Sequence, residues 1–205
     1  MQELDERMER FLTELASKAP IPGGGGAAAL MGSLAAALGS MVGNLTTGKK
    51  KYEQYQQDIE HILSVLQDSL WEIYEYIEKD AQAFEPLAKA YKIPGDQPGR
   101  EELMEEVTLQ AAKVPLDLTK KLYGIIPLLE ELEIKGSRLA ISDVAVAASC
   151  LTSALESGVM NIYINTRSLK NRQLAEEINE EAKRLSGEGV LRCKKIYERI
   201  LETLV

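Results

Sequence analysis

The chain has 205 residues and a formal net charge of -8, which disfavours a duplex nucleic-acid binder because phosphate contacts need a basic surface. That length is typical of one domain, so we expect residues 1–205 to form a single unit with a buried core. The two cysteines, Cys150 and Cys193, lie far apart without a metal-binding or pairing pattern, which predicts reduced thiols in a cytoplasmic protein.

Apolar residues recur at helical spacing along almost the whole chain, which predicts an all-α fold. The first helix is expected over residues 4–16, with an apolar face formed by Leu4, Met8, Phe11, Leu12 and Leu15. This segment is acidic and amphipathic, unlike a secretory signal peptide. Prolines at positions 20 and 22 end the helix and favour an extended backbone before the next element.

The thirty residues from Ala19 to Gly48 carry no charge, and a second helix is predicted from within 24–27 to about Thr46. The helix carries one stripe without bulky side chains, which permits close packing: Gly32, Ala36, Gly39 and Gly43. The run is long enough to span a bilayer. It lacks the bulky apolar side chains that face lipid, so we expect a helix buried in the protein and no membrane partner.

Four consecutive glycines, Gly23 to Gly26, precede this helix. Either they present free N–H groups and a positive helix end to an anion or polar heterocycle, or they permit a tight turn and close packing. The residues alone leave both interpretations open. Lys49 and Lys50 follow the helix, where the dipole favours cations, so capping alone explains them.

Residues 50–91 read as one long helix with a bend or break near Asp80. Asp80 lies three residues after Ile77 and four before Phe84, on the apolar face. A carboxylate on such a face has either a lysine partner at the rim or a function. The only histidine, His61, lies in a charged helix and is expected to be solvated, so no histidine-based triad or histidine-rich metal site is available.

A loop is predicted at residues 93–99, and further helices at 101–113, 115–132, 142–155 and 171–204. Pro115 is expected in the first turn of its helix, where proline is tolerated. Ser142 is expected to cap the next helix, with Asp143 at its positive end. Asn161 and Asn165 lie one helical turn apart among apolar residues, so their amides need partners, either on a neighbouring helix or on a ligand.

The chain resembles the cyclodeaminase/cyclohydrolase family of folate enzymes in blocks that cover nearly its whole length in matching order: PIPGGGGAAALMGSLAAALGSMVGNLT, KDAQAFEPLAKAYKIP, AAKVPLDL and SDVAVAASCLTSALESGVMNIYIN. This family comprises formiminotetrahydrofolate cyclodeaminases and methenyltetrahydrofolate cyclohydrolases. Where the family commonly has three glycines and a small residue, this chain has a fourth glycine, Gly26.

The resemblance implies an all-helical, single-domain orthogonal bundle with the small-residue helix buried inside it. It implies a homodimer or higher homo-oligomer that binds a small folate substrate and uses no metal and no cofactor. In bifunctional relatives a formiminotransferase is joined to this domain. No such domain is present in these 205 residues, so we expect the chain to receive a diffusing folate.

The resemblance implies one of two reactions. A cyclodeaminase closes 5-formiminotetrahydrofolate to 5,10-methenyltetrahydrofolate and releases ammonia. A cyclohydrolase adds water to 5,10-methenyltetrahydrofolate and opens one C–N bond, which gives 10-formyltetrahydrofolate. We place the cyclodeaminase narrowly first and the cyclohydrolase second, with a non-catalytic helical folate-binding or dimerisation protein as the alternative of another class.

Both reactions move protons onto and off nitrogen, which a positioned carboxylate does without a histidine. We expect Asp80 to transfer these protons and to stabilise the cationic amidine, with Asp143 as the second candidate. The asparagines would form hydrogen bonds with the pterin or the one-carbon group, and the glycine backbone would line the pocket. The lysines would form ion pairs with the anionic glutamate tail. These expected binding residues are Gly23, Gly24, Gly25, Gly26, Asn161, Asn165, Lys49 and Lys50.

Overall fold

The computed structural model describes the backbone of residues 2–205 and the side chains from residue 6 onward. This part of the chain forms α-helices and short 3₁₀ helices, and no strand occurs in it, which confirms the predicted all-α fold. The side chain of Leu4 lies outside the described ones. The elements are α1 (Gln2–Leu15), α2 (Gly24–Asn44), η1 (Lys50–Tyr55), α3 (Gln56–Tyr74), α4 (Tyr76–Ala90), α5 (Arg100–Gly124), α6 (Ile126–Lys135), η2 (Arg138–Ala140), α7 (Ile141–Thr166) and α8 (Arg172–Leu204).

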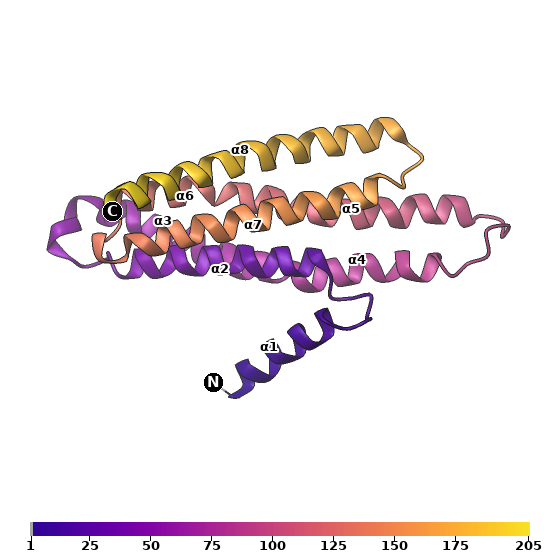
Figure 1. The fold of residues 1–205 in the computed structure, drawn as a ribbon, viewed down its shortest axis with the longest axis horizontal. Helices are drawn as coiled ribbons and strands as arrows, with labels where there is room; N and C mark the ends of the chain where they lie inside the picture. The colour runs from indigo at the N-terminus through magenta and orange to yellow at the C-terminus, as the bar shows by residue number, and fades with distance from the viewer. Residues whose placement is uncertain (1) are drawn as a thin grey trace.

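The helices form one elongated bundle from which only α1 stands apart (Figure 1). Helices α2, α5, α7 and α8 follow the long axis of the molecule, so the expected orthogonal arrangement is corrected to a lengthwise one. Helix α2 packs most extensively against α7, and α7 also packs against α8 and α5. Both α2 and α7 are rich in small residues, which allows their backbones to approach along their whole length.

The stripe of small residues on α2 serves close packing, as predicted. A Cβ atom at Gly32 would lie 2.2 Å from Cδ2 of Leu122, and one at Gly39 would lie 2.9 Å from Cδ1 of Leu66. Helix α2 and the segment 138–166 are long and apolar enough to cross a membrane, but their apolar windows are 56% and 50% buried inside the bundle. Their composition therefore follows from their central position.

The middle of the chain differs from the prediction in where its helices end. The bend expected near Asp80 lies at Glu75, whose backbone keeps nearly helical angles (φ -59°, ψ -22°) and so turns the chain without a loop. Pro115 lies inside α5 and not in a first turn. The helix continues through it because another group replaces the backbone hydrogen bond that proline removes, as described below.

The last two helices, α7 and α8, agree only in part with the helices predicted from the sequence. Helix α7 begins directly after the 3₁₀ turn η2 and is preceded by Ala140, so Ser142 lies in its first turn and is not its cap. It continues to Thr166, because Gly158 is accommodated within it. The start of α8 agrees with the prediction: Asn171 caps it by accepting a hydrogen bond from the backbone N–H of Leu174 at 3.1 Å.

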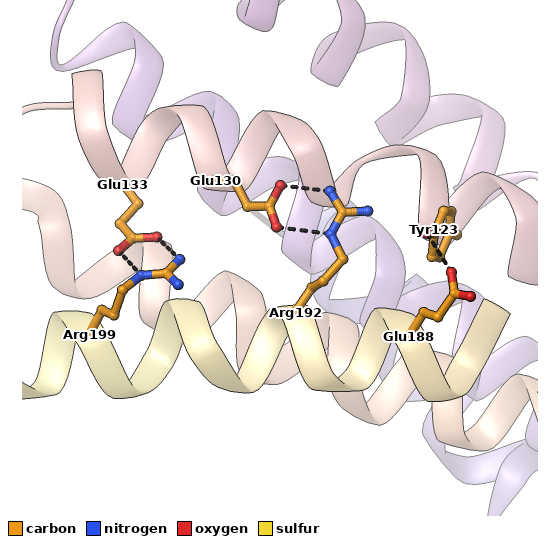
Figure 2. A network of polar contacts seen from close by, with 6 residues as sticks. All are labelled: Tyr123, Glu130, Glu133, Glu188, Arg192 and Arg199. Carbon is orange, nitrogen blue, oxygen red and sulfur yellow. Dashed lines mark hydrogen bonds and ion pairs between the residues drawn. The ribbon is translucent and has the colours of Figure 1, made fainter. Parts of the chain in front are cut away.

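Helix α8 is held against α6 by two ion pairs with matched geometry (Figure 2). Arg192 donates to both carboxylate oxygens of Glu130 at 2.9 and 2.6 Å, and Arg199 donates to both oxygens of Glu133 at 2.6 and 2.5 Å. Paired contacts of this kind fix direction as well as distance. They set the register of α8 on the bundle, whereas the buried apolar residues supply most of its stability.

Candidate active site

A small cavity of about 200 Å³ lies beside the start of α2. It is lined by residues from the loop before α2 and from α2, α4, α5 and α7: Pro20, Ile21, Gly23, Gly24, Asp80, Phe84, Ala111, Asn161, Ile164 and Asn165. The structure thus brings together the glycine run, Asp80 and both asparagines, which were singled out separately in the sequence. Among the described residues, Asp80 and the two asparagines supply the polar side chains that line this cavity.

The carboxyl group of Asp80 lies directly against the first turn of α2. A Cβ atom at Gly25 would lie 2.1 Å from Oδ1 of Asp80 and 2.4 Å from its Cγ, so no other residue fits at position 25 without displacing the carboxylate. The first turn of a helix has backbone N–H groups without partners and carries partial positive charge. The glycine run therefore provides both close approach and a favourable field for an anion.

Two opposing effects act on the pKa of Asp80. Burial raises this pKa, and a hydrogen bond from the backbone N–H of Gly26 to the carboxylate acts in the opposite direction with the smaller effect. None of the ion pairs among the described residues involves Asp80, so the alternative of a lysine partner at the rim is not observed. A carboxyl group with a raised pKa that faces a cavity is suited to proton transfer near neutral pH.

The two asparagines are held by bonds from their amide nitrogens. Asn161 Nδ2 donates to the backbone oxygen of Ser157 at 2.8 Å, and its amide lies against Gly24. Asn165 Nδ2 donates to the backbone oxygens of Asn161 and Ala111, both at 2.9 Å. The bond to Ala111 joins α7 to α5, so Asn165 makes a helix–helix contact and also lines the cavity. The partner on a neighbouring helix, one of the two alternatives left open by the sequence, is therefore observed for Asn165, and a ligand contact stays a prediction.

Three residues expected in the site lie elsewhere in the described chain. Asp143 is in the first turn of α7, 18 residues before Asn161, which corresponds to about 27 Å along the helix. Lys49 and Lys50 follow the other end of α2, about 30 Å from the glycine run. Lys49 instead donates to Oγ of Ser137 at 3.3 Å. The predictions for these three residues are corrected: within one chain they do not share the cavity with Asp80.

Two further residues line the cavity that were not predicted to do so, Ala111 and Ile164. Nothing in the sequence marks Ile164 as a cavity residue. The sequence does indicate that the carbonyl of Ala111 lacks its usual helical donor, because the residue four positions later is a proline. His61, in contrast, is exposed on α3 as expected.

The sequence model described as Formiminotransferase-cyclodeaminase matches residues 7–184 of this chain. A methenyltetrahydrofolate cyclohydrolase from Methylorubrum extorquens is 36% identical over 96% of both chains. A formimidoyltransferase-cyclodeaminase from Sus scrofa is 27% identical, and this chain spans 37% of its length. The crystal structure of a formiminotetrahydrofolate cyclodeaminase from Thermotoga maritima matches 95% of this chain and 96% of its own, with 28% identity and a TM-score of 0.82.

Proposed function

We propose a reaction for this chain from the premise that it belongs to the formiminotransferase-cyclodeaminase family. The chain is an enzyme of folate one-carbon chemistry that acts on the C–N bonds of the one-carbon unit. Of the two family reactions we now place the cyclohydrolase first: water opens 5,10-methenyltetrahydrofolate to 10-formyltetrahydrofolate. The observation that carries this choice is the 36% identity to the Methylorubrum extorquens cyclohydrolase over nearly the full length of both chains.

The second candidate reaction is the cyclodeamination of 5-formiminotetrahydrofolate. It is favoured by the likeness in fold to the Thermotoga maritima cyclodeaminase, which also matches this chain over nearly its full length. The two reactions share a tetrahedral carbon bonded to folate nitrogens, so a single arrangement of groups serves both. The identity to the cyclohydrolase exceeds that to the structure neighbour, and this difference sets the order.

Asp80 is the proposed proton carrier. In hydration, its carboxylate takes a proton from the water that attacks the methenyl carbon, and the tetrahedral adduct forms. The carboxyl group then gives this proton to the folate nitrogen that leaves when the C–N bond breaks, while the hydroxyl group of the adduct loses its own proton to water and becomes the formyl C=O. The negative charge beside the cavity also stabilises the cationic amidine of the substrate. In cyclodeamination the same group would take the proton from the attacking nitrogen and give it to the departing ammonia.

The cavity holds only part of a folate. About 200 Å³ is below the usual volume of a ligand pocket, so we propose that it receives the reacting end of the pterin while the rest of the molecule lies outside. Asn161 and Asn165 would form hydrogen bonds with this end of the pterin. No metal or cofactor belongs to this proposal, because a carboxyl group and amides are sufficient for the proton transfers described.

Separate assays with the two folates distinguish the candidate reactions. Methenyltetrahydrofolate absorbs in the near ultraviolet and the open folates do not. We expect the purified protein to accelerate the decay of this band when methenyltetrahydrofolate is supplied. Growth of the band with ammonia release from 5-formiminotetrahydrofolate would establish the cyclodeaminase instead. Lack of change with both substrates would refute the enzyme assignment.

We also propose that the chain works as a homodimer through the apolar face of α2 and α3. Trp71 is 65% exposed, Leu34 is 48% exposed, and both line an apolar cavity of about 450 Å³ between α1 and the bundle. An open apolar surface of this kind is typical of an interface. The proposed occupant is a second copy of the chain, because α2 carries no charged residue that would repel its own copy and Arg7 is the one charged residue among the described lining.

The dimer has a direct test. We expect light scattering at micromolar concentration to give twice the chain mass of 22.7 kDa. Trp71→Glu should give monomers, because a charge would be buried at the interface. Leu139→Glu is the matched control, since Leu139 is 93% exposed in η2 and does not line this cavity. A monomeric native protein, or a dimeric Trp71→Glu variant, would refute this interface.

The cysteines support our proposal of a reducing, cytoplasmic location. Cys150 and Cys193 are both free thiols. Burial raises the pKa of Cys193 to about 12, so this thiol stays protonated and unreactive. Neither cysteine takes part in the proposed reaction.

A further inference from the structure

Pro115 leaves one backbone oxygen of α5 without its helical partner. In an α-helix the N–H of each residue donates to the carbonyl four residues earlier, and proline has no N–H. The carbonyl of Ala111 is therefore free, although α5 is continuous from Arg100 to Gly124. Pro115 is buried, and Ala111 lines the cavity. A buried carbonyl of this kind needs another donor.

Asn165 supplies that donor from α7. Its Nδ2 lies 2.9 Å from the oxygen of Ala111 and 2.9 Å from the backbone oxygen of Asn161. Both partners are carbonyl oxygens, which only accept, so the NH₂ group and not Oδ1 must face them. Both hydrogens of the amide are then committed. Among the described residues no donor is bonded to Oδ1 of Asn165, and Asn165 lines the cavity.

We propose that Pro115 is a positioning residue that fixes Asn165 as a hydrogen-bond acceptor in the cavity. With its nitrogen committed, Asn165 offers only Oδ1 to a ligand, and it selects a hydrogen-bond donor, either N–H or O–H. This inference rests on the proposed function for the identity of that group: a reduced pterin carries N–H and amino donors on its ring system, and the folate nitrogen that leaves gains an N–H when the C–N bond opens. Asn161 is less constrained, because among the described residues its Nδ2 makes one hydrogen bond, to Ser157.

The substitution Pro115→Ala tests the inference by restoring the missing N–H. The new N–H would compete with Nδ2 of Asn165 for the oxygen of Ala111, so the amide of Asn165 would be held mainly by the oxygen of Asn161 and would be less firmly oriented. We expect KM for the folate substrate to rise by about tenfold, the effect of one hydrogen bond, with a smaller change in kcat. The melting temperature should not fall enough to explain the loss, because the helix gains a backbone bond.

The matched control is Pro86→Ala. Pro86 also lies inside a helix, α4, but it is exposed, and the carbonyl that it frees belongs to the exposed Gln82. Water can satisfy that carbonyl, so the substitution restores a helical bond without releasing a side chain. We expect KM and kcat of this variant to stay within about twofold of the wild type. An equal rise of KM in both proline variants would indicate a general effect of helix rigidity and would overturn the proposal.

Two further measurements separate positioning from other roles. Asn165→Leu should raise KM at least as much as Pro115→Ala, and the double variant should be no worse than Asn165→Leu alone, because Pro115 acts through Asn165. Additive losses would overturn the proposal. Nuclear magnetic resonance should show slow exchange of the Asn165 side-chain NH₂ in the wild type and faster exchange in Pro115→Ala. This readout needs no folate, so it decides the orientation even if both proposed reactions fail.

Discussion

Replacing Asp80 with asparagine is expected to lower kcat by about 10²- to 10⁴-fold, the usual contribution of a proton-transferring side chain. The asparagine keeps the shape of the side chain beside Gly25 and still accepts the hydrogen bond from Gly26, but it carries no transferable proton at neutral pH. Steady-state kinetics with both folates measures the effect. The control is Asp143→Asn, which should stay near the wild-type rate because Asp143 begins α7 far from the cavity.

The same substitution should make the protein more stable at pH 7. Burial raises the pKa of Asp80 above its unfolded value, so the ionised carboxylate costs folding free energy at neutral pH. This cost is present above the folded pKa, decreases as pH falls through it, and vanishes below the unfolded value of about 3.9. Thermal unfolding of wild type and Asp80→Asn should therefore differ most at neutral pH and converge in acid. A less stable variant with wild-type turnover would contradict the proposed role.

Gly25→Ala should be nearly as damaging to activity as the loss of the carboxylate itself. The added methyl group would lie 2.1 Å from Oδ1 of Asp80, inside van der Waals contact, so the carboxylate has to move. A displacement of about 1 Å from the reacting position costs about 10²-fold in rate. Because the methyl group enters a packed site, we also expect a loss of about 1–3 kcal/mol in unfolding free energy, measured by denaturant titration.

The adjacent glycine provides the comparison for this variant. A Cβ atom at Gly26 would have its nearest contact at 3.6 Å, to Cβ of Pro22, which is ordinary van der Waals distance. Gly25 and Gly26 are both buried in the first turn of α2, so alanine affects the helix itself similarly at both positions. Gly26→Ala should therefore retain most of the activity. Equal losses in both variants would mean that the glycine run acts through its backbone and not through room for Asp80.

The sequence predicted the site in the places where local periodicity carries the information. Asp80 was identified because its spacing from Ile77 and Phe84 puts a carboxylate on an apolar helical face, and the structure places it in a cavity. The spacing of Asn161 and Asn165 predicted a shared face in the same way. Helical periodicity therefore reports which side of a helix is buried, and it did so for both elements.

Periodicity does not report which end of a long helix meets which end of another. Asp143 and Asn161 belong to one apolar stretch, yet α7 is straight enough to separate them by about 27 Å. Lys49 is separated from the glycine run by the length of α2 in the same manner. The prediction that Pro115 lies in the first turn of a helix was wrong for a different reason. The rule that proline begins a helix assumes that no distant group replaces the lost bond, and here Asn165 does so from 50 residues later in the chain.

The carbonyl of Ala111 also has an evolutionary consequence. Pro115 leaves the backbone oxygen of Ala111 without its helical donor, and Asn165 donates to that oxygen instead. A substitution at either position therefore changes the hydrogen bonding of the other. A chain that lost the proline would regain a helical bond and release the asparagine, whereas a chain that lost the asparagine would leave a buried carbonyl unsatisfied. Neither path is neutral when taken one mutation at a time. We therefore expect the two positions, on different helices, to change together when relatives of this chain are compared.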